Sequence, residues 1–212
     1  MNQITIDVKP RGIESAYIVA PFDKGKETLE KAEYRILSSE ENARLRIQEG
    51  VKADVSQNGN WVRDCAVYIR DKGIRLTKVP LICENAEETI NCHRKGKDYL
   101  LSDEQIERVL ADSVELSGKS IPTNRFNDNA VTAYAFEDIA EQYGLFLKEA
   151  GINEMPIWLA NLQDKSFARQ LWFCRLGYVS GSDLLCANWI LHNDDGVRGV
   201  KDSAEGTARE KF

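Results

Sequence analysis

Residues 156–200 read PIWLANLQDKSFARQLWFCRLGYVSGSDLLCANWILHNDDGVRGV, and this stretch carries the strongest fold signal in the chain. It contains three short runs, 156–160, 169–173 and 197–200, that are typical of short β-strands. Loops rich in Gly, Ser, Asn and Asp separate them. Residues 193–196, Asn-Asp-Asp-Gly, form a strong hairpin-turn signal immediately before the last run, because these residue types tolerate the backbone angles of tight turns. The pattern predicts a small antiparallel sheet and a loop-rich C-terminal region.

The segment 173–196 has an unusual composition for a polar stretch. It contains no Lys, Glu, Gln or Met, although Lys and Glu together make up 33 of the 212 residues. None of these types can be reached from an Asn codon by changing only its adenines, whereas most of the residue types that occur in the segment can. Trp189 is an exception, because Trp cannot be reached in this way either. The bias indicates adenine-directed mutation of the coding DNA, or else a strand-rich segment that disfavours Lys and Glu.

Further elements are predicted upstream. Residues 4–8 alternate apolar and polar side chains, as half-buried strands do, and 65–69 and 76–79 are strand candidates around a turn at 71–73. A helical region is expected between residue 10 and Gly50, with a break at Ser38 and Ser39.

Capping boxes and helical spacing define the helices. Ser38 opens one box and Gly50 is placed to end that helix, while Ser102 opens a second helix that we expect to continue to Gly118. The clearest helix is expected over 129–150, where apolar residues keep helical spacing. With helices early and strands late, the order predicts an α+β fold with two main helices.

Length and composition describe an ordinary globular protein, 42% hydrophobic and 29% charged. No repeat or linker divides the chain, so we expect a single domain over 1–200 and a polar tail over 201–212. A net charge of -6 argues against a large basic surface, and so against nucleic acid as a partner. No apolar run has the roughly 18 residues of a membrane span. No signal-peptide pattern opens the chain, so we expect no membrane partner and cytoplasmic synthesis.

Catalytic motifs are absent from the sequence, which has two histidines and no HExxH, GxSxG, GxGxxG or P-loop pattern. Cys83, Cys92 and His93 form a grouping that matches no standard zinc spacing, and we expect buried or half-buried thiols beside a solvated histidine. Cys174 and Cys186 have no adjoining general base. We therefore predict no catalysis, no metal and no cofactor. The alternative is a small cytosolic enzyme or redox protein that uses these cysteines and histidine.

Three stretches of the C-terminal region together resemble the end of a C-type lectin-like domain: 158–177, 180–185 and 191–200. They are similar to the variable proteins of diversity-generating retroelements, and most similar to the archaeal and archaeal-virus branch. The resemblance covers 129–200 and is strongest from Pro156 onward. The residues that carry it are Trp158, Trp172, Phe173, Leu176, Asp183, Leu191 and the run 197–200.

The resemblance implies a function as well as a fold. In this family an error-prone reverse transcriptase mutates adenines and the copies replace a C-terminal variable region, while the lectin-like fold holds the backbone. It implies a non-catalytic, ligand-binding display protein whose variable region is about 173–196. Aromatic anchors mixed with small polar residues are the composition of antibody-like paratopes, so a macromolecular ligand, most simply a protein, is expected. The implied display positions are Cys174, Arg175, Gly177, Tyr178, Val179, Ser182, Leu185, Cys186, Asn188, Trp189, His192 and Asn193.

The resemblance also carries implications for the scaffold and for location. It implies that 4–8 pairs antiparallel with 197–200, and that Trp172, Phe173, Leu176, Asp183 and Leu191 belong to the scaffold. A virion or surface location stays open. The chain has Gly-Val-Arg-Gly-Val at 196–200 where familiar members have a GFR-like strand, and it lacks the EPN or QPD calcium ligands of sugar-binding lectins. Formylglycine-generating enzymes share the fold class, but their catalytic cysteines have no match here.

Overall fold

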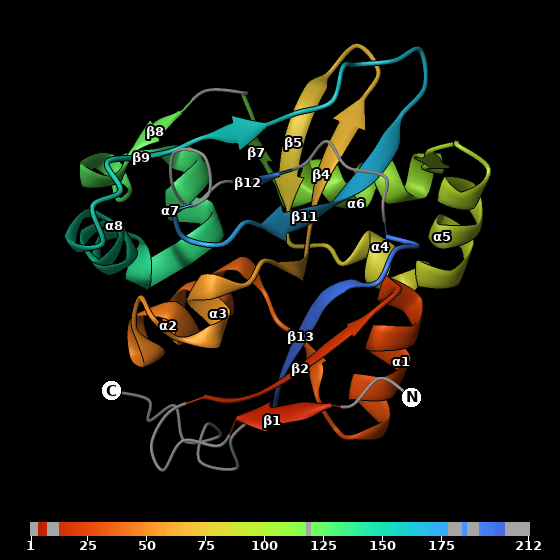
Figure 1. Cartoon of the computed structure of the whole chain (residues 1–212). Helices are drawn as coiled ribbons and strands as arrows, with labels where there is room; N and C mark the ends of the chain where they lie inside the picture. The colour runs from red at the N-terminus through yellow and green to blue at the C-terminus, as the bar shows by residue number, and fades with distance from the viewer. Residues whose placement is uncertain (1–3, 8–12, 118–119, 178–183, 186–190, 202–212) are drawn as a thin grey trace, which may run out of the picture.

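A central twisted sheet separates two groups of helices in the computed structural model, which describes residues 4–7, 13–117, 120–177, 184–185 and 191–201 (Figure 1). The strands are β1 (Thr5–Asp7), β2 (Glu14–Ala20), β3 (Arg35–Ile36), β4 (Asn60–Ile69), β5 (Gly73–Thr77), β6 (Tyr99–Leu100), β7 (Val114–Glu115), β8 (Ile121–Pro122), β9 (Glu154–Met155), β10 (Ile157–Trp158), β11 (Phe167–Phe173), β12 (Leu184–Leu185) and β13 (Asp195–Lys201).

The helices are α1 (Phe22–Lys31), α2 (Ser39–Glu49), α3 (Asp54–Gln57), α4 (Leu81–Glu84), α5 (Ala86–Arg94), α6 (Asp103–Ala111), α7 (Ala130–Phe136) and α8 (Ala140–Glu149), with 3-10 turns η1 (Thr123–Arg125) and η2 (Glu137–Ile139). No helix in the described residues combines the length and the apolar character needed to cross a membrane.

The main sheet is large, so the expected small sheet is wrong. Within the described residues it has eleven strands, in the order β1-β2-β13-β4-β11-β12-β10, with β3, β5, β6 and β7 joined at its sides. Most pairings are antiparallel, but β13 meets β4 and β10 meets β12 in parallel. The difference arises because β2 is a strand in a stretch where the sequence predicted a helix, and because β4 begins at Asn60, before the strand predicted over 65–69. Short, almost continuously apolar runs do not distinguish buried strands from buried helices.

The expected pairing of residues 4–8 with residues 197–200 is also wrong. β1 pairs with β2, and β2 pairs with β13 through seven residue pairs, including Ile18 with Val197. Ile18 is 2% exposed whereas Ile6 in β1 is 54% exposed. The more apolar strand therefore takes the inner position beside β13, and β1 forms the edge of the sheet.

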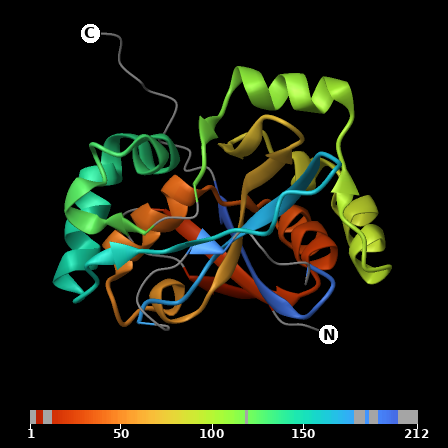
Figure 2. The same cartoon turned by 90° about the horizontal axis from the view of Figure 1, so that it is seen from above.

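Two hydrophobic cores lie on opposite faces of the sheet, because side chains alternate along each strand. On β4, Val62 and Ala66 enter the core covered by α2, α7 and α8, whereas Trp61 and Cys65 enter the core covered by α1, α4 and α5. Figure 2 shows the sheet from above, with one helical group on each side. β4 is therefore central to both cores.

The helix starts were predicted better than the helix ends. Both capping boxes are present, at Ser38 and at Ser102, and Gly50 ends α2 with a positive φ of 90°. The second helix, α6, stops at Ala111 and not at Gly118, because Val114 pairs with Leu76 in the sheet.

The helix predicted over 129–150 is interrupted, which corrects that expectation. Asn129 caps α7 through its side chain, and α7 ends where Glu137 adopts a positive φ of 52°. A 3-10 turn then leads into α8. The described residues thus hold several helices of similar length where two main helices were expected.

Candidate ligand-binding surface

The segment 173–196 leaves the sheet from the end of β11, and its first residues are held through their backbone. The Cys174 carbonyl accepts a hydrogen bond from Arg46 Nη2 at 2.7 Å, and the Leu176 N–H donates to the Ser56 carbonyl at 2.8 Å. The preceding Phe173 is fully buried, and the Arg46 guanidinium lies 5.5 Å from its ring centroid. The start of the segment is therefore attached to α2 and α3.

Arg46 is a buried residue whose hydrogen bonds join four parts of the molecule. It is 0% exposed and, besides Cys174, it donates to the Val55 carbonyl at 3.1 Å and to the Tyr143 hydroxyl at 3.1 Å. These contacts join α2, α3, α8 and the end of β11. A buried guanidinium is stabilised only when such acceptors surround it.

The segment returns to the sheet through a second set of backbone and side-chain contacts. The carbonyl of Leu191, which is fully buried, accepts a hydrogen bond from the Phe22 N–H at 2.8 Å, at the start of α1. In β13, Arg198 is 2% exposed, pairs with Asp54 and lies 4.7 Å from the Tyr17 ring centroid. Helix α3 therefore contacts both ends, through Ser56 at the entry and through Asp54 at the exit.

Aromatic residues lie level with one another across neighbouring strands. Trp158 in β10 pairs with Leu185 in β12, Leu185 with Trp172 in β11, and Trp172 with Trp61 in β4. The Trp61 and Trp172 rings make an edge contact, with centroids 4.8 Å apart. A Cβ at Gly59 would lie 2.4 Å from the Trp172 indole, so the backbone passes directly against that ring. Exposure rises along the row, from 1% at Trp61 to 49% at Trp158.

Apart from Cys174, the predicted display positions fall into three groups. Arg175, Gly177 and Asn193 are exposed, and His192 is half-buried. Leu185 is in β12, between β10 and β11. Six positions lie outside the described residues: Tyr178, Val179, Ser182, Cys186, Asn188 and Trp189.

Cys174 does not meet the expectation of surface display, because it is only 8% exposed. It directly follows the last residue of β11, where the Arg46 contact draws the backbone inward. Among the expected scaffold positions, Phe173, Leu176 and Leu191 are buried, as is most of β13, and Trp172 is partly buried. Asp183 lies outside the described residues. Trp158, one of the residues that carry the resemblance, is 49% exposed.

His93 is buried, at 3% exposed, which corrects the expectation of a solvated histidine. In the described part of the chain, neither of its ring nitrogens has a hydrogen-bond partner. Burial lowers its pKa to about 4, helped by the positive charge of Arg169 and opposed by Asp98. Arg169 and Asp98 form a buried ion pair at 2.7 Å, and His192, near the end of the segment 173–196, also contributes to lowering the His93 pKa. A buried polar group thus lies near the exit of the segment.

Cys65 and Cys83 do not have the properties of activated thiols. Burial raises the pKa of Cys83 to about 12 and that of Cys65 well above its usual value. No hydrogen bond joins Cys83, Cys92 and His93 to one another within the described chain. A thiol with a raised pKa is a poor nucleophile, because only the thiolate reacts.

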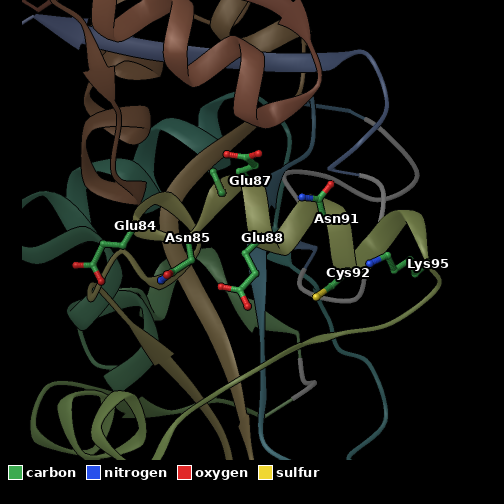
Figure 3. Close-up of a pocket in the computed structure, with 8 residues that line it drawn as sticks. Glu84, Asn85, Glu87, Glu88, Asn91, Cys92 and Lys95 are labelled. Atoms are coloured by element: carbon green, nitrogen blue, oxygen red, sulfur yellow. The ribbon is translucent and has the colours of Figure 1, made fainter.

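A groove beside α5 has a cavity of about 510 Å³, and its lining includes the acidic residues Glu84, Glu87 and Glu88. Figure 3 shows that the carboxylates of Glu84, Glu87 and Glu88 point in different directions and do not converge. Glu84 is paired with Arg108. In the described residues, no three His, Cys, Asp or Glu side chains gather where they could hold a metal ion.

Comparisons with known proteins give a fold likeness and no sequence relative. No family model matches the chain, and no curated protein matches it. A solved structure described as "Accommodation of massive sequence variation in Nanoarchaeota by the C-type lectin fold" is similar, with a TM-score of 0.65 and 15% sequence identity. The likeness covers 92% of this chain and 99% of that chain. The chain therefore has a C-type lectin-like fold, here with a large sheet.

Proposed function

We propose that this protein is a non-catalytic display protein that binds a macromolecular ligand through its C-terminal segment, 173–196. The proposal extends to the origin of that segment, which we attribute to retroelement-directed mutation of adenines. The fold likeness supports it, because the similar structure is described as accommodating massive sequence variation. The lack of Lys, Glu, Gln and Met in the segment supports the genetic part.

One structural observation carries the proposal: the segment is attached to the scaffold through its own backbone. The Cys174 carbonyl, the Leu176 N–H and the Leu191 carbonyl make the contacts with Arg46, Ser56 and Phe22. Backbone hydrogen bonds do not depend on the side chain of the residue that makes them. The exposed positions of the segment can therefore change residue type without loss of these attachments.

The proposed contact residues are the display positions predicted from the sequence, without Cys174, whose side chain is buried. Arg175, Gly177 and Asn193 are the exposed members within the described residues. Binding residues are commonly carried on loops that a rigid scaffold positions. Both ends of this segment are attached to the scaffold by backbone hydrogen bonds, so the scaffold positions the loop between them.

The genetic part of the proposal is tested by sequencing the DNA beside the gene. We expect an imperfect repeat of the 173–196 coding region whose differences coincide with adenines in the template copy, next to a reverse transcriptase gene. If neither is present, the retroelement origin is wrong. The remaining proposal is then a lectin-like binding module without diversification.

The division into contact positions and scaffold positions is tested with a library randomised at the eleven proposed contact positions. We expect most members to melt within a few degrees of the parent, because surface substitutions usually change stability by less than about 0.5 kcal/mol each. Trp172→Ala is the matched scaffold variant, and it should destabilise by about 3 kcal/mol or more. A library that unfolds while Trp172→Ala stays as stable as the parent would show that the two sets are reversed.

A further inference from the structure

We propose that Trp158 is a fixed contact residue of the ligand-binding surface and that it docks against an apolar patch on a protein ligand. This inference rests on the proposed function and adds to it a residue outside the segment 173–196. Trp158 belongs to β10, fifteen residues before that segment begins.

The strand pairing brings Trp158 beside the segment. β10 and β11 lie on either side of β12, and the register places position 185, a proposed contact position, directly between Trp158 and Trp172. Residues in register across a sheet lie on the same face, with Cβ atoms about 5 Å apart. Trp158 therefore borders a position that we expect to vary.

The two faces of β10 differ sharply in burial. Ile157 is 6% exposed and packs in the core on the α2, α7 and α8 side, so Trp158 faces the opposite side of the sheet. Trp61 and Trp172 lie on that same side, in the other core. The sheet order ends at β10, and Trp158 is 49% exposed where Trp61 is 1% exposed. The aromatic row therefore begins with a buried side chain at Trp61, inside the sheet, and ends with a half-exposed side chain at Trp158, at the edge of the sheet.

Trp158 is distinct from the other exposed apolar residues of the described chain. The large exposed apolar side chains are Ile6, Val19, Val51, Leu100, Leu145, Trp158 and Leu162, and Trp158 is the one aromatic residue among them. Trp can bury up to about 250 Å² and has only two side-chain torsions to fix, so it gives much contact area at small entropic cost. Residues of this kind dominate the affinity of protein interfaces.

The chemistry of the row indicates the kind of ligand. Trp158, position 185 and Trp172 carry no charge and offer no carboxylate or amide, which sugars need beside a stacking ring. An apolar patch on a folded protein is the complement of such a surface. A fixed aromatic anchor next to variable positions would also supply affinity that every variant shares, while the variable positions supply specificity.

The test uses the full-length chain displayed on yeast, with the eleven contact positions randomised and Trp158 retained, selected against lysozyme as the probe protein. In the selected binders we expect Trp158→Ala to weaken the dissociation constant for lysozyme at least tenfold. Leu162→Ala is the matched control, since Leu162 is 53% exposed and lies four residues further along, and it should change affinity less than twofold. If Trp158→Ala lowers the melting temperature, Trp158→Leu keeps an apolar side chain without the ring, and the same tenfold loss is expected.

The outcomes separate the two proposals. A folded library that yields no lysozyme binders overturns the proposed function, and this inference with it. Binders whose affinity changes less than twofold in both Trp158→Ala and Trp158→Leu overturn this inference alone. Titration of the parent protein with simple methyl glycosides completes the test, because saturable binding that Trp158→Ala abolishes would assign this residue to a sugar site and overturn the protein ligand.

Discussion

At positions 46, 169 and 198 the chain buries a guanidinium group, and each lies near an end of the segment 173–196. Their exposed fractions are 0%, 1% and 2%. Arg169 pairs with Asp98, and Arg198 with Asp54. Arg is almost never fully buried unless it is paired. The sequence does not show which arginines have such partners, so these three could not be predicted to be buried. Asp98 and Asp54 are remote in sequence from Arg169 and Arg198, and only folding brings each pair together.

Arg46 provides the sharpest test at this scale. Arg46→Met keeps the apolar stem but removes every donor, which leaves the buried carbonyls of Val55 and Cys174 without this partner. We expect a loss of about 3 kcal/mol in the free energy of unfolding, because each unsatisfied buried polar group costs about 1–3 kcal/mol. Denaturant titration measures it.

The control for that variant lies half a turn away on the same helix. Arg44 has a side chain that is 37% exposed and pairs with Glu40 and Asp138. Arg44→Met should cost less than about 1 kcal/mol, because exposed ion pairs contribute little. Equal losses in the two variants would contradict the role assigned to Arg46.

His93 predicts a pH dependence of stability. Its pKa is about 4 in the folded protein, against 6.5 for an ordinary histidine, so between these values the unfolded chain binds more protons than the native one. The stability is therefore complete above about pH 6.5 and is lost as the pH falls towards 4, by up to about 3 kcal/mol from this residue. His93→Leu removes this contribution. From pH 7 to pH 4 we expect the unfolding free energy of the parent to fall relative to that of His93→Leu. If the difference between the two proteins stayed constant over this range, the assigned pKa would be ruled out.

At the scale of single elements, α8 shows a conflict between helix propensity and packing. Gly144 is in the middle of α8, where Ala would ordinarily stabilise the helix by about 1 kcal/mol. A Cβ at this position would lie 2.2 Å from the backbone carbonyl of Thr123, which cannot easily move. We therefore expect Gly144→Ala to destabilise by about 2 kcal/mol, in thermal or denaturant unfolding.

The neighbouring position is the control for Gly144. Leu145 is 54% exposed, and Leu145→Ala should stay within about 0.5 kcal/mol of the parent. If Gly144→Ala proved stabilising, the close approach of α8 to η1 would be wrong.

Local chemistry decided which elements were predictable. The capping boxes at Ser38 and Ser102 need only residues within one turn, and both were predicted correctly. The break at Glu137 was not predicted, because apolar spacing continues through it. Its side chain pairs with Lys78 and the adjacent Asp138 pairs with Arg44, so tertiary contacts accompany the break. The edge position of Trp158 likewise depends on strand order, which a short apolar run does not specify.

At the scale of the whole molecule, the strands of the C-terminal region were predictable because their signals are local: β10, β11 and β13 each overlap a run predicted from the sequence. The hairpin turn predicted at residues 193–196 is wrong, because Asp195 and Gly196 already belong to β13 and pair with β2. The N-terminal half was not predictable, since β2 is inserted between β1 and β13 by long-range pairing. The candidate site was proposed from composition, whereas its attachment to α3 and the position of Trp158 beside β12 became visible only in the tertiary structure.

The last prediction concerns the cooperativity of the whole chain. β2 near the N-terminus pairs with β13 near the C-terminus, and both helical groups pack on strands of one sheet. Neither helical group can unfold without exposing a core face of β4, so we expect a single unfolding transition.

Tryptophan fluorescence, which reports on the sheet through Trp61, Trp158 and Trp172, should give the same midpoint as the helical signal in circular dichroism. Ile18→Ala, in β2, should lower both midpoints together, by an amount equivalent to about 2–4 kcal/mol, because Ile18 is 2% exposed. If the helical signal were lost at a lower temperature than the fluorescence signal, or if Ile18→Ala shifted only one of them, residues 1–200 would comprise more than one folding unit.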